Sequence, residues 1–429
     1  MSTSADDWWS PRTDVPLHEW RPSAFEMLPA DMPEARRVHE RVWVSTGLSH
    51  AWLVTTDDGR VVVNTGMALE SPVHKRNFDA VDDSPVRAVI YTQGHVDHVG
   101  GTALFRDEGT EVIAQAANVE HQEFDERLFQ YRIDRSDFAF QDTVRDGAIR
   151  IYQEFGSLPE QVPHEPTLLF DDRHEMTIGG VDFELLSTPG GETFDSLVVW
   201  LPQYKVAICG NLFSALTGHI PNLVTLRGDR YRQPLMFVDS LERVRALGAE
   251  TLLVGHHGPI VGAEYIDQEL ARVRDATLYV HQATLDGMNT RKSLWELMNT
   301  IELPPELKIG EGYGKVSWDV RAIWEQYVGW FKHESTTELY GSPRESIDAD
   351  LVELAGGPDP VAARARTAFD DGDPVKAIHL AEAATRADPG HAEARSVLLD
   401  AHRALLAESE NFWLTSWLRH QVKLLEPGE

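Results

Sequence analysis

The stretch that decides the fold is PVRAVIY at residues 85–91, followed directly by TQGHVDHVGG at residues 92–101. The first part is a short apolar run, which is typical of a buried strand. The second part places His95, Asp97 and His98 on a turn just after that strand, where α/β folds expose their ligands. Two histidines and an aspartate so close together are seldom a core feature. The pattern therefore predicts a metal site.

The pattern around this turn predicts a mixed α/β domain. Gly100 and Gly101 suit a close approach between the strand and the next helix. Strands are predicted at 110–114, 167–170, 181–187, 196–201, 205–209 and 251–254, and helices at 102–107, 118–136, 233–247 and 263–289. Strands mixed with helices in this order indicate an α/β sandwich up to about residue 285.

Two further segments flank this predicted domain, which covers residues 38–285. Residues 1–37 are rich in proline and aperiodic, which predicts either an arm wrapped around the domain or a partly ordered tail. Residues 286–429 are helical in pattern, and Ala377, Ala381 and Ala384 recur at helix-pair spacing. Such small residues indicate a tetratricopeptide-like helical hairpin, which we expect to serve packing or dimerisation.

Composition excludes several classes of protein. The 429 residues carry 39 basic and 69 acidic side chains, a net charge of −30, which argues against binding nucleic acid or anionic membranes. No run of residues is apolar enough to predict a membrane span. The single cysteine, Cys209, excludes a disulfide framework and a multi-cysteine zinc site. The polar first residues do not resemble an export signal, so the cytoplasm is the expected location.

The segment at 92–101 resembles the HxHxDH motif of metallo-β-lactamase-fold hydrolases. Segments at 188–202, 206–211 and 252–259 follow in the same order, and those at 221–250 and 313–339 are similar to the alkyl sulfatase branch. This resemblance implies a metallo-β-lactamase αββα sandwich followed by an all-α dimerisation domain, and hence a homodimer. It also implies a hydrolase in which a divalent metal ion activates water to attack a small organic sulfate or related ester. We expect no counterpart of the branch's C-terminal sterol-carrier-like domain.

The resemblance also implies roles for individual residues. His95 and Glu192 are expected to bind one ion; Asp97, His98 and His256 are expected to bind a second, with His257 as the alternative to His256. For catalysis we expect Asp97 together with His219, which lies between two site segments and could donate a proton. Arg227 is expected to bind the sulfate group, because its guanidinium pairs two anionic oxygens at once; a surface salt bridge is the alternative. Further candidates for lining the substrate pocket are Tyr231, Arg232 and Trp318.

Three departures from the family pattern bear on the metal and the reaction. Gln93 stands where the motif has its first histidine, Asn211 where a bridging acid is expected, and Trp318 where the branch usually has a histidine. Because neutral amides bind borderline-soft ions poorly, four readings stay open. These are one zinc ion at Asp97, His98 and His256; two ions with amide or water ligands; a harder ion such as manganese or iron; or no ion. The alternatives to a hydrolase are a metalloenzyme of another class, a lyase or redox enzyme, and a non-catalytic dimeric scaffold.

Overall fold

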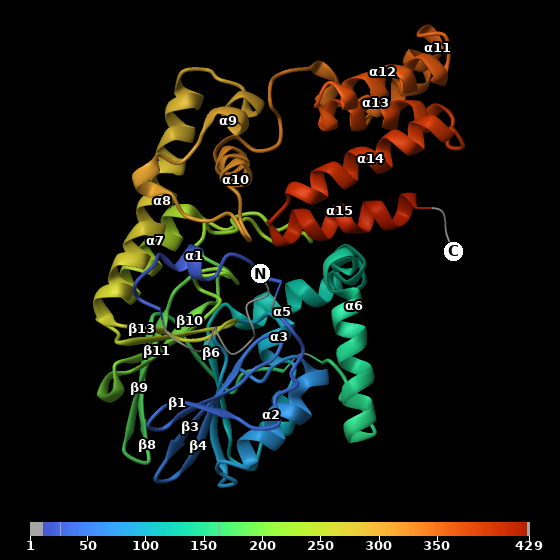
Figure 1. The fold of residues 1–429 in the computed structure, drawn as a ribbon. Coiled ribbons are helices and arrows are strands. Elements are labelled where there is room, and N and C mark those ends of the chain that lie inside the picture. The colour runs from blue at the N-terminus through green and yellow to red at the C-terminus, as the bar shows by residue number, and fades with distance from the viewer. Residues whose placement is uncertain (1–11, 26, 163, 427–429) are drawn as a thin grey trace. The chain divides into compact units, whose positions relative to one another are not determined.

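The computed structural model describes residues 12–25, 27–162 and 164–426 and contains two β-sheets in its N-terminal part (Figure 1). The first sheet has seven strands in sequence order. They are β1 (Arg36–His39), β2 (Val42–Ser45), β3 (Ala51–Thr56), β4 (Gly59–Val63), β5 (Val86–Ile90), β6 (Glu111–Gln115) and β7 (Leu168–Phe170). The pairs from β1 to β4 are antiparallel, and the pairs from β4 to β7 are parallel.

The second sheet has six strands in the order β13-β12-β11-β10-β9-β8. Its pairs are antiparallel except for β11 and β12, which run parallel. The strands are β8 (Arg173–Ile178), β9 (Val181–Ser187), β10 (Leu197–Leu201), β11 (Val206–Gly210), β12 (Thr251–Val254) and β13 (Ile260–Val261). β8 was missed by the sequence prediction, because its half-exposed, charged residues give a weak strand signal.

The inner faces of the two sheets pack against each other. Buried residues of the first sheet, such as Val61 and Ile90, share one apolar cluster with Phe183 and Val199 of the second. This alternation of buried side chains is what face-to-face sheets require. The expected sandwich of two sheets is thereby confirmed.

Helices cover the outer faces of both sheets. On the first sheet they are α2 (Ser71–Asp79), α3 (Val96–Val99) and α4 (Thr102–Phe105), which contribute Phe78, Val99 and Phe105 to one cluster. On the second sheet they are α7 (Pro234–Arg245) and α8 (Ala263–Asn289), whose Leu241 and Leu270 pack on strand residues. α9 (Leu294–Thr300) and α10 (Val316–Val328) pack into this second cluster as well.

The segment expected as one helix at 118–136 forms two helices instead. α5 (Asn118–Arg127) ends at Leu128, and α6 (Phe129–Phe155) continues far beyond the predicted end. Only Gly147 and Ile151 of α6 are buried, so its sequence shows little of the periodicity from which its length could have been predicted.

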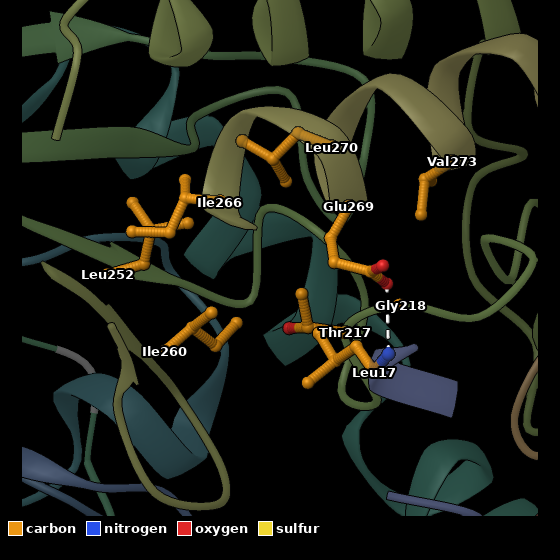
Figure 2. A pocket seen from close by; sticks show the side chains of 9 residues that line it. All are labelled: Leu17, Thr217, Gly218, Leu252, Ile260, Ile266, Glu269, Leu270 and Val273. Atoms are coloured by element: carbon orange, nitrogen blue, oxygen red, sulfur yellow. Dashed lines mark hydrogen bonds between the residues drawn. The ribbon is translucent and has the colours of Figure 1, made fainter. Parts of the chain in front are cut away.

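The described part of the N-terminal arm packs against this domain, while residues 1–11 lie outside the described residues. It contains α1 (Leu17–Trp20), and Leu17 is fully buried in the cluster that covers the second sheet. The Leu17 N–H donates to Oε2 of buried Glu269 on α8 (3.0 Å). Figure 2 shows this bond at the edge of a small apolar pocket formed by Leu252, Ile260 and other residues.

Contacts divide the chain into the units Met1–Gln326 and Tyr327–Glu429. The second unit is helical, as expected, and its consecutive helices pack through small alanines such as Ala365, Ala381 and Ala394. Its helices are α11 (Asp348–Leu354), α12 (Pro358–Asp370), α13 (Pro374–Ala387), α14 (Ala392–Glu408) and α15 (Phe412–Leu425). The tetratricopeptide-like character of the hairpin and the domain boundaries at 37/38 and 285/286 stay predictions.

Short 3₁₀ helices complete the description. They are η2 (Ala68–Glu70), η3 (Pro202–Tyr204), η4 (Pro305–Leu307), η5 (Thr336–Leu339) and η6 (Arg344–Ile347). Within the described residues, none of the helices combines the length and the apolar character needed to cross a bilayer.

Candidate metal and substrate site

The expected ligands meet at one edge of the sandwich, beyond the ends of several strands. His95, Asp97 and His98 follow β5, Asn211 follows β11, and His256 follows β12. Since β11 and β12 run parallel, their carboxyl ends lie at the same edge. Gly101 permits the close approach of the turn after β5, because a Cβ there would lie only 2.4 Å from the Thr65 carbonyl oxygen.

His98 and His256 flank the side chain of Asn211, and Asp97 lies beside His98. The Asn211 amide nitrogen lies 3.2 Å from His98 Nε2 and 3.1 Å from His256 Nε2. Asp97 Oδ2 lies 3.3 Å from His98 Nε2 and accepts a hydrogen bond from the Ser49 hydroxyl (2.6 Å). The three expected ligands of one ion are thus brought together, with an amide between the two imidazoles.

His95 lies in a second half of the pocket, close to Gln93 and Glu192. Its Nδ1 is 3.0 Å from Gln93 Nε2 and 3.6 Å from Glu192 Oε1. Glu192 Oε1 also pairs with buried Arg232 at 2.8 Å, while Glu192 Oε2 is buried without a hydrogen-bond partner. A guanidinium therefore already balances the Glu192 charge.

Arg227 lies beside the outer nitrogen of His95. Its NH2 atom is 3.4 Å from His95 Nε2 and 3.9 Å from Asp229 Oδ2, and its Nε is buried without a hydrogen-bond partner. Asp229 Oδ2 in turn lies 3.1 Å from His95 Nε2. Arg227 thus lies in the pocket, within ion-pair distance of Asp229, and its role in binding sulfate stays a prediction.

Burial sets the protonation of the imidazoles. It lowers the pKa of His95 to about 3 and that of His256 to about 4, and it lowers the pKa of His98 as well. Burial alone would raise the pKa of Asp97, but His98 and the other nearby imidazoles outweigh it, so the pKa lies below its ordinary value. Near neutral pH the pocket thus offers uncharged imidazoles and an ionised carboxylate, the forms that bind metals.

A further group of possible ligands lies next to His95. The ligand atoms of His95, His121 and Asp125 come within 4.8 Å of one another. Arg132 NH2, however, lies 3.1 Å from Asp125 Oδ1 and 3.6 Å from Asp229 Oδ1. Because a guanidinium already faces both carboxylates, we assign no metal ion to this group.

The other residues predicted for the site differ in the contacts that they make. His219 donates from Nε2 to the Arg21 carbonyl oxygen (2.7 Å) and accepts at Nδ1 from the Gly312 N–H (3.0 Å). Both ring nitrogens bond to backbone groups, so its expected role as proton donor stays a prediction.

The Tyr231 hydroxyl donates to Glu325, and Trp318 is half-buried on α10; their roles in substrate binding stay predictions. His257 lies next to His256 in a left-handed backbone conformation (φ 69°) and accepts from His50 through its carbonyl oxygen.

Three polar residues of the pocket were missed by the sequence analysis. Ser49 bonds to Asp97, Asn64 to His98, and Asp229 to His95. The only local signal for Asn64 is a polar residue at the end of the apolar run VVV, in the left-handed region (φ 57°). The other two lie in loops, where no spacing rule identifies them.

Comparisons with known proteins agree with the geometry of fold and pocket. Residues 44–256 match the metallo-β-lactamase superfamily, and residues 294–427 match the alkyl sulfatase dimerisation family. The chain is 30% identical over 392 residues to a linear primary-alkylsulfatase of a Pseudomonas species, covering 87% of this chain and 73% of that protein. An alkyl/aryl-sulfatase of Saccharomyces cerevisiae is 26% identical, covering 90% of this chain and 63% of that protein.

A solved structure shares the fold over most of the chain. It is a stereoselective inverting sec-alkylsulfatase from a Pseudomonas species, with a TM-score of 0.81 and 24% identity, covering 92% of this chain and 66% of that one. The class that fold and pocket define is thus a metallo-β-lactamase-fold protein with an added helical domain. More narrowly, the chain belongs to the alkylsulfatase branch of that superfamily.

These comparisons confirm the family and the fold expected from the sequence, and with them a hydrolase of the alkyl sulfatase type. They do not favour a lyase, a redox enzyme or a non-catalytic scaffold. The chain spans 63% of the yeast relative, 66% of the solved structure and 73% of the linear primary-alkylsulfatase.

Proposed function

We propose that this protein hydrolyses the sulfate ester of a small organic alcohol with the help of one divalent metal ion. The observation that carries this proposal is Arg227, whose unpartnered buried Nε lies in the pocket that holds Asp97, His98 and His256. A guanidinium with free donors beside a set of metal-ligating residues suits an ester that carries a sulfate anion. The names of the relatives support the same substrate class.

The donor atoms fit one ion better than two. Asp97, His98 and His256 supply one carboxylate and two imidazoles, an open three-ligand set of the kind that catalytic zinc uses. On the other side, Arg232 pairs with Glu192, and no carboxylate stands at Asn211 to bridge a second ion. We therefore propose one zinc ion, with manganese or iron as the alternative that a metal analysis distinguishes.

When bound, the ion supplies an activated water and stabilises negative charge. The residues of the chain do the rest. Arg227 binds two sulfate oxygens through its planar fork, and Asp229 keeps the guanidinium oriented from 3.9 Å away. Such fixed charges at the reacting group supply a large part of catalysis, because they need no rearrangement during the reaction.

A cavity beside the metal pocket offers space for the organic part of the ester. A cavity of about 280 Å³ opens next to His95, since Gly94 and Val96 line it. Phe129, Val99 and Val162 supply apolar surface, while Asp125 and Glu126 add polar groups. We propose that this cavity accepts the alkyl group of the substrate and limits its length.

The assembly and the location belong to the proposal as well. The match to the alkyl sulfatase dimerisation family supports a homodimer. For the location, we propose the cytoplasm, as the sequence predicts. Size measurement in solution and fractionation of cells test these two points.

The first test changes Arg227. With a linear primary alkyl sulfate as substrate, we expect Arg227→Gln to lower kcat/KM about 10²- to 10³-fold, because it removes a fixed charge at the sulfate group. Arg227→Lys should lose less, since it keeps the charge without the fork. Released inorganic sulfate is measured, and Arg87→Gln, at an exposed arginine paired with Asp58, is the matched control. Activity of Arg227→Gln within twofold of the control contradicts the assignment.

A further inference from the structure

His256 lies on a loop between two paired strands. Residues 255–259, which we call the His256 loop, join β12 to β13, antiparallel strands in which Leu252 pairs with Ile260. Within the loop, His257 has a left-handed backbone (φ 69°), a conformation that is uncommon for residues other than glycine. The position of His256 therefore depends on the groups to which the backbone of this loop bonds.

Three carbonyl oxygens of the His256 loop bond to two residues that lie far away in the chain. The His50 N–H donates to Gly255 O (2.8 Å), and His50 Nε2 lies 3.0 Å from His257 O. The NH2 group of Arg21 donates to Gly258 O. An arginine of the N-terminal arm thus bonds directly to the loop that carries a predicted metal ligand.

Arg21 is a buried cation with few hydrogen-bond acceptors. Its side chain is only 1% exposed, and its NH2 group also donates to the Pro259 carbonyl oxygen (3.3 Å). Its Nε and NH1 atoms are buried without a hydrogen-bond partner in the described part of the chain. Burial lowers the pKa of Arg21 to about 9, so the guanidinium stays charged near neutral pH. Because a buried charge is costly to leave unbonded, movement of the loop carbonyls away from Arg21 is unfavourable.

Separate contacts fix the backbone around Arg21. The Arg21 N–H donates to Leu17 O (2.8 Å), and the Arg21 carbonyl oxygen lies 2.7 Å from His219 Nε2. Leu17 is fully buried beside Leu252 and Ile260, which belong to the two strands that the loop joins (Figure 2). The arm is therefore anchored to the same strands from which the His256 loop emerges.

We propose that Arg21 is a positioning residue, which holds the His256 loop so that His256 stays beside His98 and thereby raises the metal affinity of the pocket. The rings of His98 and His256 lie 6.4 Å apart, measured between their centroids. The hydrogen bonds from Arg21 are suited to hold the loop, since bonds from an ionised donor are about twice as strong as neutral ones. This inference deepens the proposed function and rests on its metal pocket.

The charge of Arg21 and its hydrogen bonds act on metal affinity in opposite directions. A cation near the pocket repels a divalent metal ion, so loss of the charge alone would tighten metal binding. Loss of the bonds to Gly258 and Pro259 would weaken metal binding, because His256 must then be ordered when the ion binds. The sign of the change in affinity therefore separates the two effects.

Three variants distinguish positioning from its alternatives. Arg21→Gln removes both the charge and the reach of the side chain. Arg21→Lys keeps the charge but places it on one compact ammonium group rather than on a planar guanidinium. Tyr265→Phe is the matched control for a loosened arm. It removes the hydrogen bond from the Tyr265 hydroxyl to the Val15 carbonyl oxygen (2.9 Å) but keeps the bonds of the His256 loop.

The first readout is titration of the metal-free proteins with Zn²⁺ in competition with a coloured chelator. Arg21→Gln should bind Zn²⁺ about 10- to 100-fold more weakly than the wild type, the usual effect of changing the outer partners of metal ligands. Arg21→Lys should lie between these two affinities, and Tyr265→Phe should stay within twofold of the wild type.

Two results of this titration overturn the inference. One is an affinity of Arg21→Gln equal to or tighter than that of the wild type. The other is an equal loss in Tyr265→Phe, because a loosened arm would then explain the effect. If Arg21→Gln does not fold, Arg21→Lys decides, and wild-type affinity in that variant overturns the inference as well.

The second readout is the visible absorption of the proteins saturated with Co²⁺, which reports the number and geometry of the metal ligands. The bands of Arg21→Gln should differ from those of the wild type, whereas Tyr265→Phe should reproduce them. Identical spectra of Arg21→Gln and the wild type overturn the inference. Sulfate release is measured separately: its absence from the zinc-loaded wild type contradicts the proposed function but leaves the affinities and the spectra standing.

Discussion

At the scale of single residues, the amide side chains of Gln93 and Asn211 limit how many metal ligands the pocket offers. Gln93 and Asn211 replace a histidine and an acid of the family pattern, and both contact imidazoles in the structure. Asn211 Oδ1 is buried and has no hydrogen-bond partner, so this amide is poorly satisfied where it lies. The imidazole and the carboxylate that a second metal ion needs as ligands are therefore missing at these two positions.

Restoring both residues tests this reading. The double variant Gln93→His, Asn211→Asp should raise the metal content from about one ion per chain toward two, because it returns an imidazole and a bridging carboxylate. Elemental analysis of protein purified under identical conditions gives the count. An unchanged count means that the amides do not limit the second ion.

Much of the pocket could be predicted from the sequence, but only the part that a motif describes. His95, Asp97 and His98 stand close together in the chain, and the family pattern added Glu192 and His256 by matching separate segments. Partners such as Asn64 and Ser49 lie in loops elsewhere in the chain and meet the ligands only after folding. His219 lies between two site segments, but both of its ring nitrogens bond to backbone groups, so its expected role in proton transfer stays a prediction.

At the scale of secondary structure, close packing of the turn after β5 places the ligands. A Cβ on Gly101 would lie 2.4 Å from both the Thr65 carbonyl oxygen and the Ser71 side chain. Since part of this contact is backbone, the turn and α4 must shift to relieve it. The pair Gly100 and Gly101, noted in the sequence for a close approach, has this role.

The corresponding substitution is Gly101→Ala. We expect it to lower the free energy of unfolding by about 1–3 kcal/mol, the usual cost of overpacking. Gly341→Ala is the control, because a Cβ there meets nothing within 4 Å. Urea unfolding of both variants measures the difference, and equal midpoints contradict the packing argument.

Most strands were predicted within a residue or two, because short apolar runs bounded by turns are a strong signal. The length of α6 was not predicted. Almost all of its residues are at least partly exposed, so its sequence shows little of the apolar periodicity of a packed helix. The 1–37 arm was predicted only as a choice between an ordered arm and a loose tail. Burial of Leu17 against strand and helix residues favours the first for the described part.

At the scale of the whole molecule, buried histidines make stability depend on pH. Burial lowers the pKa of His74 to about 3 and that of His50 to about 3. Between their ordinary value and these values, the unfolded chain binds protons that the folded chain does not, so stability falls as the pH falls. Glu70 acts in the opposite sense, since burial raises its pKa to about 7 and the folded protein holds the extra proton.

His74→Gln isolates one of these contributions. Between pH 6.5 and pH 5 the wild type should lose about 2 kcal/mol more stability than this variant, at about 1.4 kcal/mol per pH unit for one proton. Urea midpoints at both pH values give the difference, and His379→Gln, at an exposed position, is the control. If His74→Gln follows the wild type at both pH values, His74 is not held neutral by burial.

The measurement that tests the central claim most directly is sulfate release from a linear primary alkyl sulfate as a function of added Zn²⁺. The account predicts little release by chelator-treated protein, a rise to a plateau near one ion per chain, and no rise for Asp97→Ala, which lacks the carboxylate ligand. Release that is independent of metal, or that persists in Asp97→Ala with Zn²⁺, would contradict it.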